Sequence, residues 1–382
     1  MQFPLTEEQR LIQDTAREFA DKEIAPVADA HNRAGAFPTA LVKRLGELGF
    51  LGMLVPEAYG GSGIGNFGLV VALEEVNRAC ASTGVTMSVQ SSLVCAPIVH
   101  WGNEALKKKY LPKLASGEFL GAYALSEPGS GSDAAGLVTS AVKDGDSYIL
   151  NGTKNFITTG AEADIVIAMV RTDPAHKTRG ITAFIVERGW KGFSVGKKED
   201  KLGLRSSSTV QLVFEDLRVP ASNMLGEIGA GFKIAMHTLD GGRIGIAAQA
   251  VGIAQACLDA SIKYAEEREA FDQQIGKFQA VQFKIANMAM KIEAARLLVY
   301  NAARLKDQGE PHAKEASTAK LFASEASNEA AREAVQIHGG AGYLEDFPVE
   351  RYFRDARITE IYEGTSEIQR IVIARHLLKN LR

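Results

Sequence analysis

The sequence predicts an α+β protein with three blocks, in the order helical, β, helical. Apolar residues recur at helical spacing before about residue 116, and the period switches to two between Gly121 and Asn223. After Gly231 the chain is rich in Ala, Glu, Lys and Leu, as long helices are. A chain of 382 residues exceeds what one hydrophobic core usually serves, so we expect several domains, at 1–120, 121–230 and 231–382.

The first block predicts four helices. Thr6 can cap a helix that runs towards Ile24 and ends at Pro26. The other three are expected at about 38–48, 67–77 and 105–114, where apolar residues lie at helical spacing. A strand-like stretch at 50–55 stands between the second and the third.

The middle block predicts many short strands. Asp144-Gly145 and Asn151-Gly152 are hairpin-type turn signals next to apolar runs. Further strands are expected at 165–170, 181–186 and 209–214. Short strands without intervening helices favour an antiparallel barrel or sandwich of about a hundred residues.

The last block predicts a bundle of helices. They are expected at 231–237, 244–267, 277–309, 314–338 and 368–381. The residues 240–243, Asp-Gly-Gly-Arg, lie between the first two. They form either a plain turn with an ion pair or a place where polar groups meet a ligand.

Composition excludes several classes of protein. The net charge of −3 argues against a nucleic-acid binder, which usually has a basic excess. The cysteines, Cys80, Cys95 and Cys257, form no CxxC pair and suit a reducing compartment, and no histidine spacing indicates a metal site. The N-terminal region has no apolar core of a signal peptide, and no apolar run approaches the length of a membrane span. A cytoplasmic protein is expected, or a mitochondrial matrix protein if the chain is a processed eukaryotic form.

The segment from Ile361 to Arg370 places a carboxylate beside a glycine, directly before a helix start. Ser366 and Gln369 have the spacing of a capping box. Glu363 would therefore sit on a turn that can aim it into a cavity. Shielding from water raises the pKa of a carboxyl group towards neutrality and suits it to act as a general base. The alternative is a surface glutamate that opens a C-terminal helix.

Three glycine-rich segments are candidates for ligand contact. Gly63 to Gly68 has the G-x-G-x-x-G pattern of dinucleotide-binding folds, but no second strand with an acidic tip follows, so a plain loop is the alternative. Tyr123 to Asp133 can bring backbone N–H groups close to a ligand, or it is a mobile loop. Gln336 to Tyr343 is either a ligand contact or the glycine cap of a helix. It has more glycines than a cap needs.

Taken in order, these segments resemble the acyl-CoA dehydrogenase family over essentially the whole chain. Residues 124–136 and 336–355 match the two signatures of the family, and residues 357–378 with 239–249 are most similar to its short-chain, butyryl-CoA branch. The resemblance implies an N-terminal helical domain, a middle antiparallel β-barrel and a C-terminal four-helix bundle. It also implies non-covalent FAD in a cleft at a subunit interface, usually within a homotetramer.

The resemblance further implies which residues contact FAD and substrate. Thr158 would hydrogen-bond near flavin N5, and a neighbouring subunit would supply most contacts to the pyrophosphate and adenosine. The implied FAD contacts are Tyr123, Leu125, Ser126, Gly131, Ser132, Phe156, Ile157, Thr158, Arg268, Phe271, Gln279, Gln336, Ile337, Gly339, Gly340, Thr365 and Glu367. The implied substrate contacts are Ser132, Leu239, Asp240, Arg243, Tyr362 and Gly364.

The implied reaction is the α,β-dehydrogenation of an acyl-CoA thioester to trans-2-enoyl-CoA. Glu363 would take the α-proton, flavin N5 would accept the β-hydride, and an electron-transferring flavoprotein would accept the electrons. One branch of the family carries its base directly before the arginine that matches Arg243. That position is Gly242 here, so the resemblance implies Glu363. The alternatives are an acyl-CoA oxidase that uses O₂, a non-catalytic assembly protein on the same scaffold, and a nicotinamide-dependent dehydrogenase.

Overall fold

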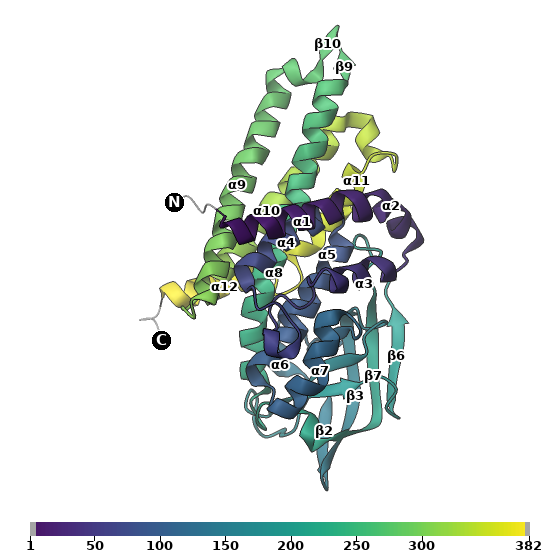
Figure 1. Cartoon of the computed structure of the whole chain (residues 1–382), viewed down its shortest axis with the longest axis vertical. Helices are drawn as coiled ribbons and strands as arrows, with labels where there is room; N and C mark the ends of the chain where they lie inside the picture. Colours follow the sequence, from purple (N-terminus) through teal and green to yellow (C-terminus); the bar gives the residue numbers. More distant parts are fainter. Residues whose placement is uncertain (1–4, 379–382) are drawn as a thin grey trace.

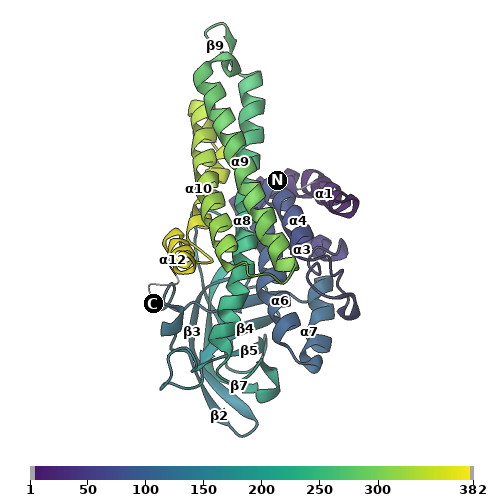
Figure 2. The ribbon, with the colours of Figure 1, turned by 90° about the vertical axis from the view of Figure 1, so that its left-hand side faces the viewer.

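The computed structural model describes residues 5–378 and has a helical part at one end and a β-sheet at the other (Figure 1). Turned by a quarter, the molecule shows the long helices of the C-terminal block side by side along its long axis (Figure 2). The predicted order of a helical, a β and a second helical block is confirmed.

The N-terminal block is helical. The capping box at Thr6 is present, because the side chains of Thr6 and Gln9 each accept from the backbone N–H of the other residue. The helix does not end at Pro26 as predicted: a π-helical turn at Ala20–Ile24 leads into a second helix, and Pro26 lies in the first turn of that helix, where its missing N–H costs little. The helices are α1 (Glu7–Phe19), α2 (Ala25–Ala34), α3 (Thr39–Glu47), α4 (Asn66–Ala79), α5 (Ala81–Ser88), α6 (Ala96–Trp101) and α7 (Glu104–Ser116).

Two parts of this block differ from the prediction. Residues 50–55 form turns instead of a strand. The sequence pattern also gave no sign of α5, of the π-helical segment Val89–Cys95 that follows it, or of α6. Every residue of α5 and of the π-helical segment is buried, so no polar face marks the helical period there.

The middle block is an open mixed sheet, so the predicted antiparallel barrel is wrong. The hydrogen-bonded order is β6-β7-β3-β2-β4-β5-β8, and β1 pairs with β4 in parallel. A barrel would require its end strands to pair, and within residues 5–378 β6 and β8 do not. The strands are β1 (Gly121–Ala124), β2 (Ser140–Asp144), β3 (Ser147–Thr158), β4 (Ile165–Arg171), β5 (Ile181–Glu187), β6 (Phe193–Lys198), β7 (Thr209–Pro220) and β8 (Met224–Leu225).

One predicted hairpin turn is confirmed and the other is wrong. Asp144 and Gly145 join β2 to β3, with Gly145 at a φ of 62°. Asn151 and Gly152 lie inside β3, where the register with β7 shifts. A Cβ atom at Gly152 would lie 2.6 Å from the Thr139 Oγ1, so the glycine permits a close strand contact and does not turn the chain.

The C-terminal block consists of helices and one short hairpin. The predicted break at 240–243 is wrong, because α8 runs through it without interruption. Leu381, the predicted end of the last helix, lies outside the described residues. The elements are α8 (Gly231–Glu267), β9 (Glu269–Ala270), β10 (Gln273–Gln274), α9 (Gln279–Asp307), α10 (Ala313–His338), α11 (Val349–Ala356) and α12 (Ser366–Leu377).

The central helix of this block is α8, which packs against α4, α9 and α10. In the described part of the chain, α8 alone is long and apolar enough to cross a membrane by length and composition. However, 83% of its most apolar window is buried inside the protein. Its apolar character is therefore that of a core helix.

Candidate active site

Glu363 lies on a tight turn directly before α12. Its φ of 55° and the φ of 91° at Gly364 are both in the left-handed region, which a glutamate rarely adopts. The helix begins one residue earlier than the predicted capping box requires, because Thr365 is the N-cap and accepts from the Ile368 N–H at 3.4 Å. Glu363 therefore stands outside the helix.

Two side chains hold the carbonyl groups of this turn. Gln369 Nε2 donates to the Glu363 carbonyl at 3.1 Å and to the Gly364 carbonyl at 2.9 Å. Lys320 Nζ, from α10, donates to the Gly364 carbonyl at 2.8 Å. Lys320 is not among the site residues predicted from the sequence, although it interrupts a buried helix face made of small residues: Ala316, Ser317, Ala319, Ala323, Ser324 and Ser327.

The Glu363 carboxyl group forms no hydrogen bond with the described residues. Its Oε2 atom is buried and has no hydrogen-bond partner in the described part of the chain. Burial raises the pKa of Glu363 to about 7, while the positive charges of Arg243 and Lys320 act to lower it. A carboxyl group with this pKa can exchange a proton near neutral pH.

Asp240, Gly242 and Arg243 bring one stretch of α8 to this site. A Cβ atom at Gly242 would lie 2.5 Å from Glu363 Oε2, so only glycine leaves room for the carboxyl group there. Arg243 is buried and donates to Asp240 at 2.5 Å. Leu239, the residue before Asp240, is half-buried.

Two tyrosines border the same region. The Tyr123 hydroxyl group, from β1, is buried and has no partner among residues 5–378, and burial together with the Glu363 charge raises the pKa of Tyr123. Tyr362 donates to Gln249 Oε1, and Gln249 Nε2 donates to the Ala81 carbonyl at 2.9 Å. This chain of hydrogen bonds joins the turn to α8 and α5.

The loop after β1 lies beside the end of β3. The Asn155 N–H donates to the Ser126 carbonyl at 2.8 Å, and the buried Lys154 and Glu127 form an ion pair at 2.8 Å. The loop is therefore fixed to the sheet at two points. Of the predicted FAD contacts in this region, Leu125 and Ile157 are buried, Ser126 and Thr158 are half-buried, and Gly131, Ser132 and Phe156 are exposed.

The remaining predicted FAD contacts, apart from Thr365 and the exposed Glu367 on α12, lie far from Glu363. Phe271 lies in the turn of the β9–β10 hairpin, and Arg268 and Gln279 lie on either side of it; both views place this hairpin at the end opposite the sheet (Figures 1 and 2). The end of α10 lies on that side too, because His338 stacks on Tyr264 of α8 with ring centroids 4.2 Å apart. This end carries the exposed Gln336, Gly339 and Gly340 and the buried Ile337. A single chain therefore does not bring together the predicted FAD contacts near Glu363 and those near the β9–β10 hairpin.

The glycine pattern at 63–68 does not belong to a dinucleotide fold. No strand precedes it in the described structure, and α4 begins inside it. The N-terminus of α4 is already bound to a carboxylate, because Asp307 accepts from the Asn66 N–H at 2.7 Å and from the Phe67 N–H at 2.8 Å.

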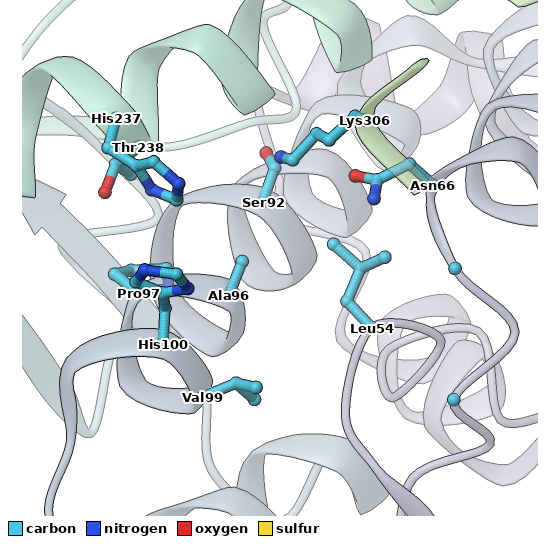
Figure 3. Close-up of a pocket in the computed structure, with 12 residues that line it drawn as sticks. Leu54, Asn66, Ser92, Ala96, Pro97, Val99, His100, His237, Thr238 and Lys306 are labelled. Carbon is cyan, nitrogen blue, oxygen red and sulfur yellow. The ribbon is translucent and has the colours of Figure 1, made fainter. Parts of the chain in front are cut away.

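A cavity of about 230 Å³ opens between α6, α8 and the end of α9 (Figure 3). His100 and His237 stack across it with ring centroids 4.6 Å apart, and Lys306 reaches it from α9. Ser92 and Thr238 line its inner part, and Thr238 lies one helical turn before Gly242 on α8. Residues 5–378 contain no cluster of three or more His, Cys, Asp or Glu side chains that could hold a metal ion.

Comparison with known proteins places the whole described chain in one family. Family models for the N-terminal, middle and C-terminal domains of acyl-CoA dehydrogenases match residues 6–118, 122–217 and 229–378. The chain is 53% identical over 378 residues to the mitochondrial short-chain specific acyl-CoA dehydrogenase of Mus musculus, covering 99% of this chain and 92% of the relative.

Solved structures agree with this relationship. Butyryl-CoA dehydrogenase from Megasphaera elsdenii has a TM-score of 0.97 and 47% identity, covering 99% and 100% of the two chains. A chain of a structure of the electron transferring flavoprotein of Acidaminococcus fermentans has a TM-score of 0.98, 50% identity and the same coverage. An acyl-CoA dehydrogenase complexed with FAD from Bacillus anthracis has a TM-score of 0.93 and 38% identity, covering 98% of this chain and 68% of that one. The chain belongs to the acyl-CoA dehydrogenase family.

Proposed function

We propose that the protein is an FAD-dependent acyl-CoA dehydrogenase that converts short-chain acyl-CoA thioesters to trans-2-enoyl-CoA. The observation that carries this proposal is the Glu363 carboxyl group, whose buried Oε2 has no partner in the described part of the chain and whose pKa is about 7. Such a group can hold a proton taken from a weak carbon acid, and family membership supplies the class of substrate.

In this proposal Glu363 removes the α-proton as the α C–H bond breaks. The hydrogen on the β-carbon leaves with its electron pair, so a carbon–carbon double bond forms. The Glu363 N–H has no backbone acceptor among residues 5–378 and is free to donate to the thioester carbonyl. One donor of this kind is typically worth about 3–4 kcal/mol when negative charge develops on the oxygen.

The residues proposed to contact the flavin leave room for a flat aromatic cofactor. The Tyr123 hydroxyl group has no partner among residues 5–378, Phe156 is 62% exposed, and a Cβ atom at Gly131 would meet nothing within 4 Å. Thr158, Thr365 and the loop from Leu125 to Ser132 would hold the flavin part of FAD. When bound, FAD supplies the acceptor for the β-hydride.

A second copy of the chain would complete the FAD site. Arg268, Phe271 and Gln279 lie at the far end of the molecule from Glu363, and Phe271 is 88% exposed. We propose that they, with Gln336 to Gly340, bind the pyrophosphate and adenosine parts of FAD held by a neighbouring subunit. A homotetramer is the assembly that the family resemblance implies.

The substrate would lie along α8 beside Glu363. Ser132, Leu239, Asp240, Arg243 and Gly364 are the proposed contacts to the CoA thioester. We propose that the hydrogen bonds from Tyr362 to Gln249 and from Gln249 to Ala81 close one side of the site, which would limit it to a short acyl chain.

The proposed electron acceptor is an electron-transferring flavoprotein in the cytoplasm. The resemblance in fold to a chain of the Acidaminococcus structure supports the kind of partner. The cysteines Cys80, Cys95 and Cys257 are free and buried, which suits a reducing compartment.

Anaerobic bleaching of the flavin by acyl-CoA thioesters from C3 to C16 tests this function. We expect rapid bleaching that is greatest near C4, and little hydrogen peroxide when air is admitted during turnover. Stoichiometric peroxide would indicate an oxidase instead. A purified protein that cannot be loaded with FAD would favour the non-catalytic alternative.

A further inference from the structure

Lys320 is a fully buried lysine beside the Glu363 turn, and it forms no ion pair with the Glu363 carboxylate in the described structure. It lies on α10 with 0% of its surface exposed, and its Nζ donates to the Gly364 carbonyl at 2.8 Å. No salt bridge to Lys320 is present among the described residues. Burying a charged ammonium group is costly, so its place beside the Glu363 turn requires a reason.

The turn itself needs to be held. Glu363 has a φ of 55°, which costs about 1 kcal/mol or more for a residue with a side chain. Lys320 and Gln369 both donate to the Gly364 carbonyl, at 2.8 and 2.9 Å, and Gln369 also donates to the Glu363 carbonyl. A charged donor and a neutral donor therefore share one acceptor, and only the charged donor also acts on the carboxyl group through space.

We propose that Lys320 is a positioning residue for Glu363: its ammonium group holds the Gly364 carbonyl, so that the turn aims the carboxyl group into the site, and its charge keeps that carboxyl group able to ionise. This inference rests on the proposed function of Glu363 as the base. Lys320 itself does not touch the reacting atoms in this proposal.

Two cations lower the pKa of Glu363. The charge of Arg243 has the larger effect, but Arg243 is paired with Asp240, whereas Lys320 has no ion-pair partner among the described residues. Burial lowers the pKa of Lys320 to about 8 and the Glu363 charge opposes this, so Lys320 is mostly protonated at neutral pH. The groups that face this pair are Arg243 from α8, Tyr123 from β1, and Glu360, Tyr362 and Glu367 from the segment around the turn.

The test compares the two donors to the same carbonyl. Lys320→Met removes the hydrogen bond and the charge, whereas Gln369→Leu removes hydrogen bonds only. Lys320→Arg keeps the charge, and Lys284→Met removes a lysine of α9 that is paired with Glu333 of α10. Two properties are measured in the FAD-loaded proteins: the pH dependence of flavin reduction by butyryl-CoA, and the titration of the Glu363 carboxyl carbon by ¹³C NMR, assigned by its loss in Glu363→Gln.

We expect the midpoint of both curves to rise by about one pH unit in Lys320→Met, because an opposite charge nearby lowers a carboxyl pKa by roughly 1–3 units. Flavin reduction at pH 7 should fall about fivefold to tenfold from the loss of ionised Glu363, with a further loss from the looser turn. Gln369→Leu should be slower with a midpoint near that of the wild type. Lys320→Arg should restore the midpoint, and Lys284→Met should change nothing.

An unchanged midpoint in Lys320→Met, with a lower rate, would overturn the proposal and leave Lys320 a structural residue. If that variant does not fold, Lys320→Gln carries the same comparison, because it is also neutral and retains a donor for the Gly364 carbonyl. Failure of the proposed function would look different: wild-type flavin would not bleach at any pH, while the NMR titration would still report whether Lys320 acts on Glu363.

Discussion

Two glutamates, the buried Glu127 and the half-buried Glu363 with its buried Oε2, each lie near a buried lysine, and their surroundings give them opposite properties. Glu127 binds Lys154 at 2.8 Å and accepts from the Val138 N–H at 2.6 Å and the Thr139 N–H at 2.9 Å. Burial opposes its ionisation, but these partners together lower the pKa of Glu127. It is a fully satisfied anion that fixes a loop.

Glu363 also has a buried lysine nearby, but that lysine does not bind its carboxylate. Its Oε2 has no partner in the described structure, and the nearby Lys320 donates to a backbone carbonyl instead of to the carboxylate. Burial therefore dominates, and the pKa of Glu363 rises to about 7. The comparison teaches that burial alone does not make a base: what matters is whether the hydrogen-bond donors around a carboxylate bind it or are directed elsewhere.

The largest expected effect is on turnover, from Glu363→Gln. This substitution keeps the shape of the side chain and removes its ability to take a proton, so flavin reduction by butyryl-CoA should fall by about 10²–10⁴-fold. Bound FAD should remain, as measured by its absorbance. Glu325→Gln, at an exposed ion pair with Arg370, is the matched control and should react normally. Full activity of Glu363→Gln would refute the assignment of the base.

The same substitution at the other glutamate should affect the fold instead. Glu127→Gln leaves the ammonium group of Lys154 buried without its counter-charge, and breaking a buried pair costs about 3–5 kcal/mol. Urea denaturation of the FAD-loaded protein should show this loss. The double variant Glu127→Gln/Lys154→Met should recover part of it, because no unpaired charge remains. A wild-type midpoint for Glu127→Gln would contradict the view that this pair holds the loop.

The pH dependence of stability should differ in sign between the two sites. The folded-state pKa of Glu363 is raised from 4.5 to about 7, so this residue weakens the fold progressively as pH rises across that interval. The free energy of unfolding of Glu363→Gln should therefore exceed that of the wild type by roughly 1–3 kcal/mol at pH 8, and the two should be equal below pH 4. The pKa of Glu127 is lowered, so its contribution to stability is fully present above pH 4.5 and is lost as the pH falls through its folded-state pKa.

Urea denaturation from pH 4 to pH 8 measures both differences in the free energy of unfolding. The difference between wild type and Glu127→Gln should be largest at neutral pH and shrink in acid. If both differences changed in the same direction with pH, the contrast between the two carboxylates would be wrong.

The sequence predicted the order of blocks and the position of Glu363 before a helix, because those features are local. The continuous apolar runs of β4 and β5 and the capping residues at Thr6 depend on neighbours in the chain. The closed barrel was wrong because closure depends on pairing between the end strands β6 and β8, which no local pattern encodes. The break at Gly241 and Gly242 was wrong for a similar reason: these glycines serve close packing against Lys306 and Glu363.

In the candidate site, no sequence pattern indicated Lys320 or Gln369 as donors to the turn. A lysine on an Ala- and Ser-rich helix reads as a solvated residue unless the burial of that face is known. The predicted FAD contacts remain predictions. Their division into two distant groups follows from α8 and α9 extending away from the sheet, which only the three-dimensional arrangement reveals.

The smallest expected effect concerns the polar bridge beside Glu363, where hydrogen bonds are satisfied as they are at Glu127. Gln249 is fully buried and links Tyr362 to the Ala81 carbonyl. Gln249→Ala should remove that bridge and open space, so that the ratio of kcat/KM for hexanoyl-CoA to that for butyryl-CoA rises about tenfold, the typical worth of a methylene or two in an apolar pocket. Gln255 lies on the same helix as Gln249, and Gln255→Ala, which loses hydrogen bonds with Asp259 of α8 and Arg296 of α9, should leave the ratio unchanged. An unchanged ratio in Gln249→Ala would mean that the bridge fixes the turn but does not limit the length of the acyl chain.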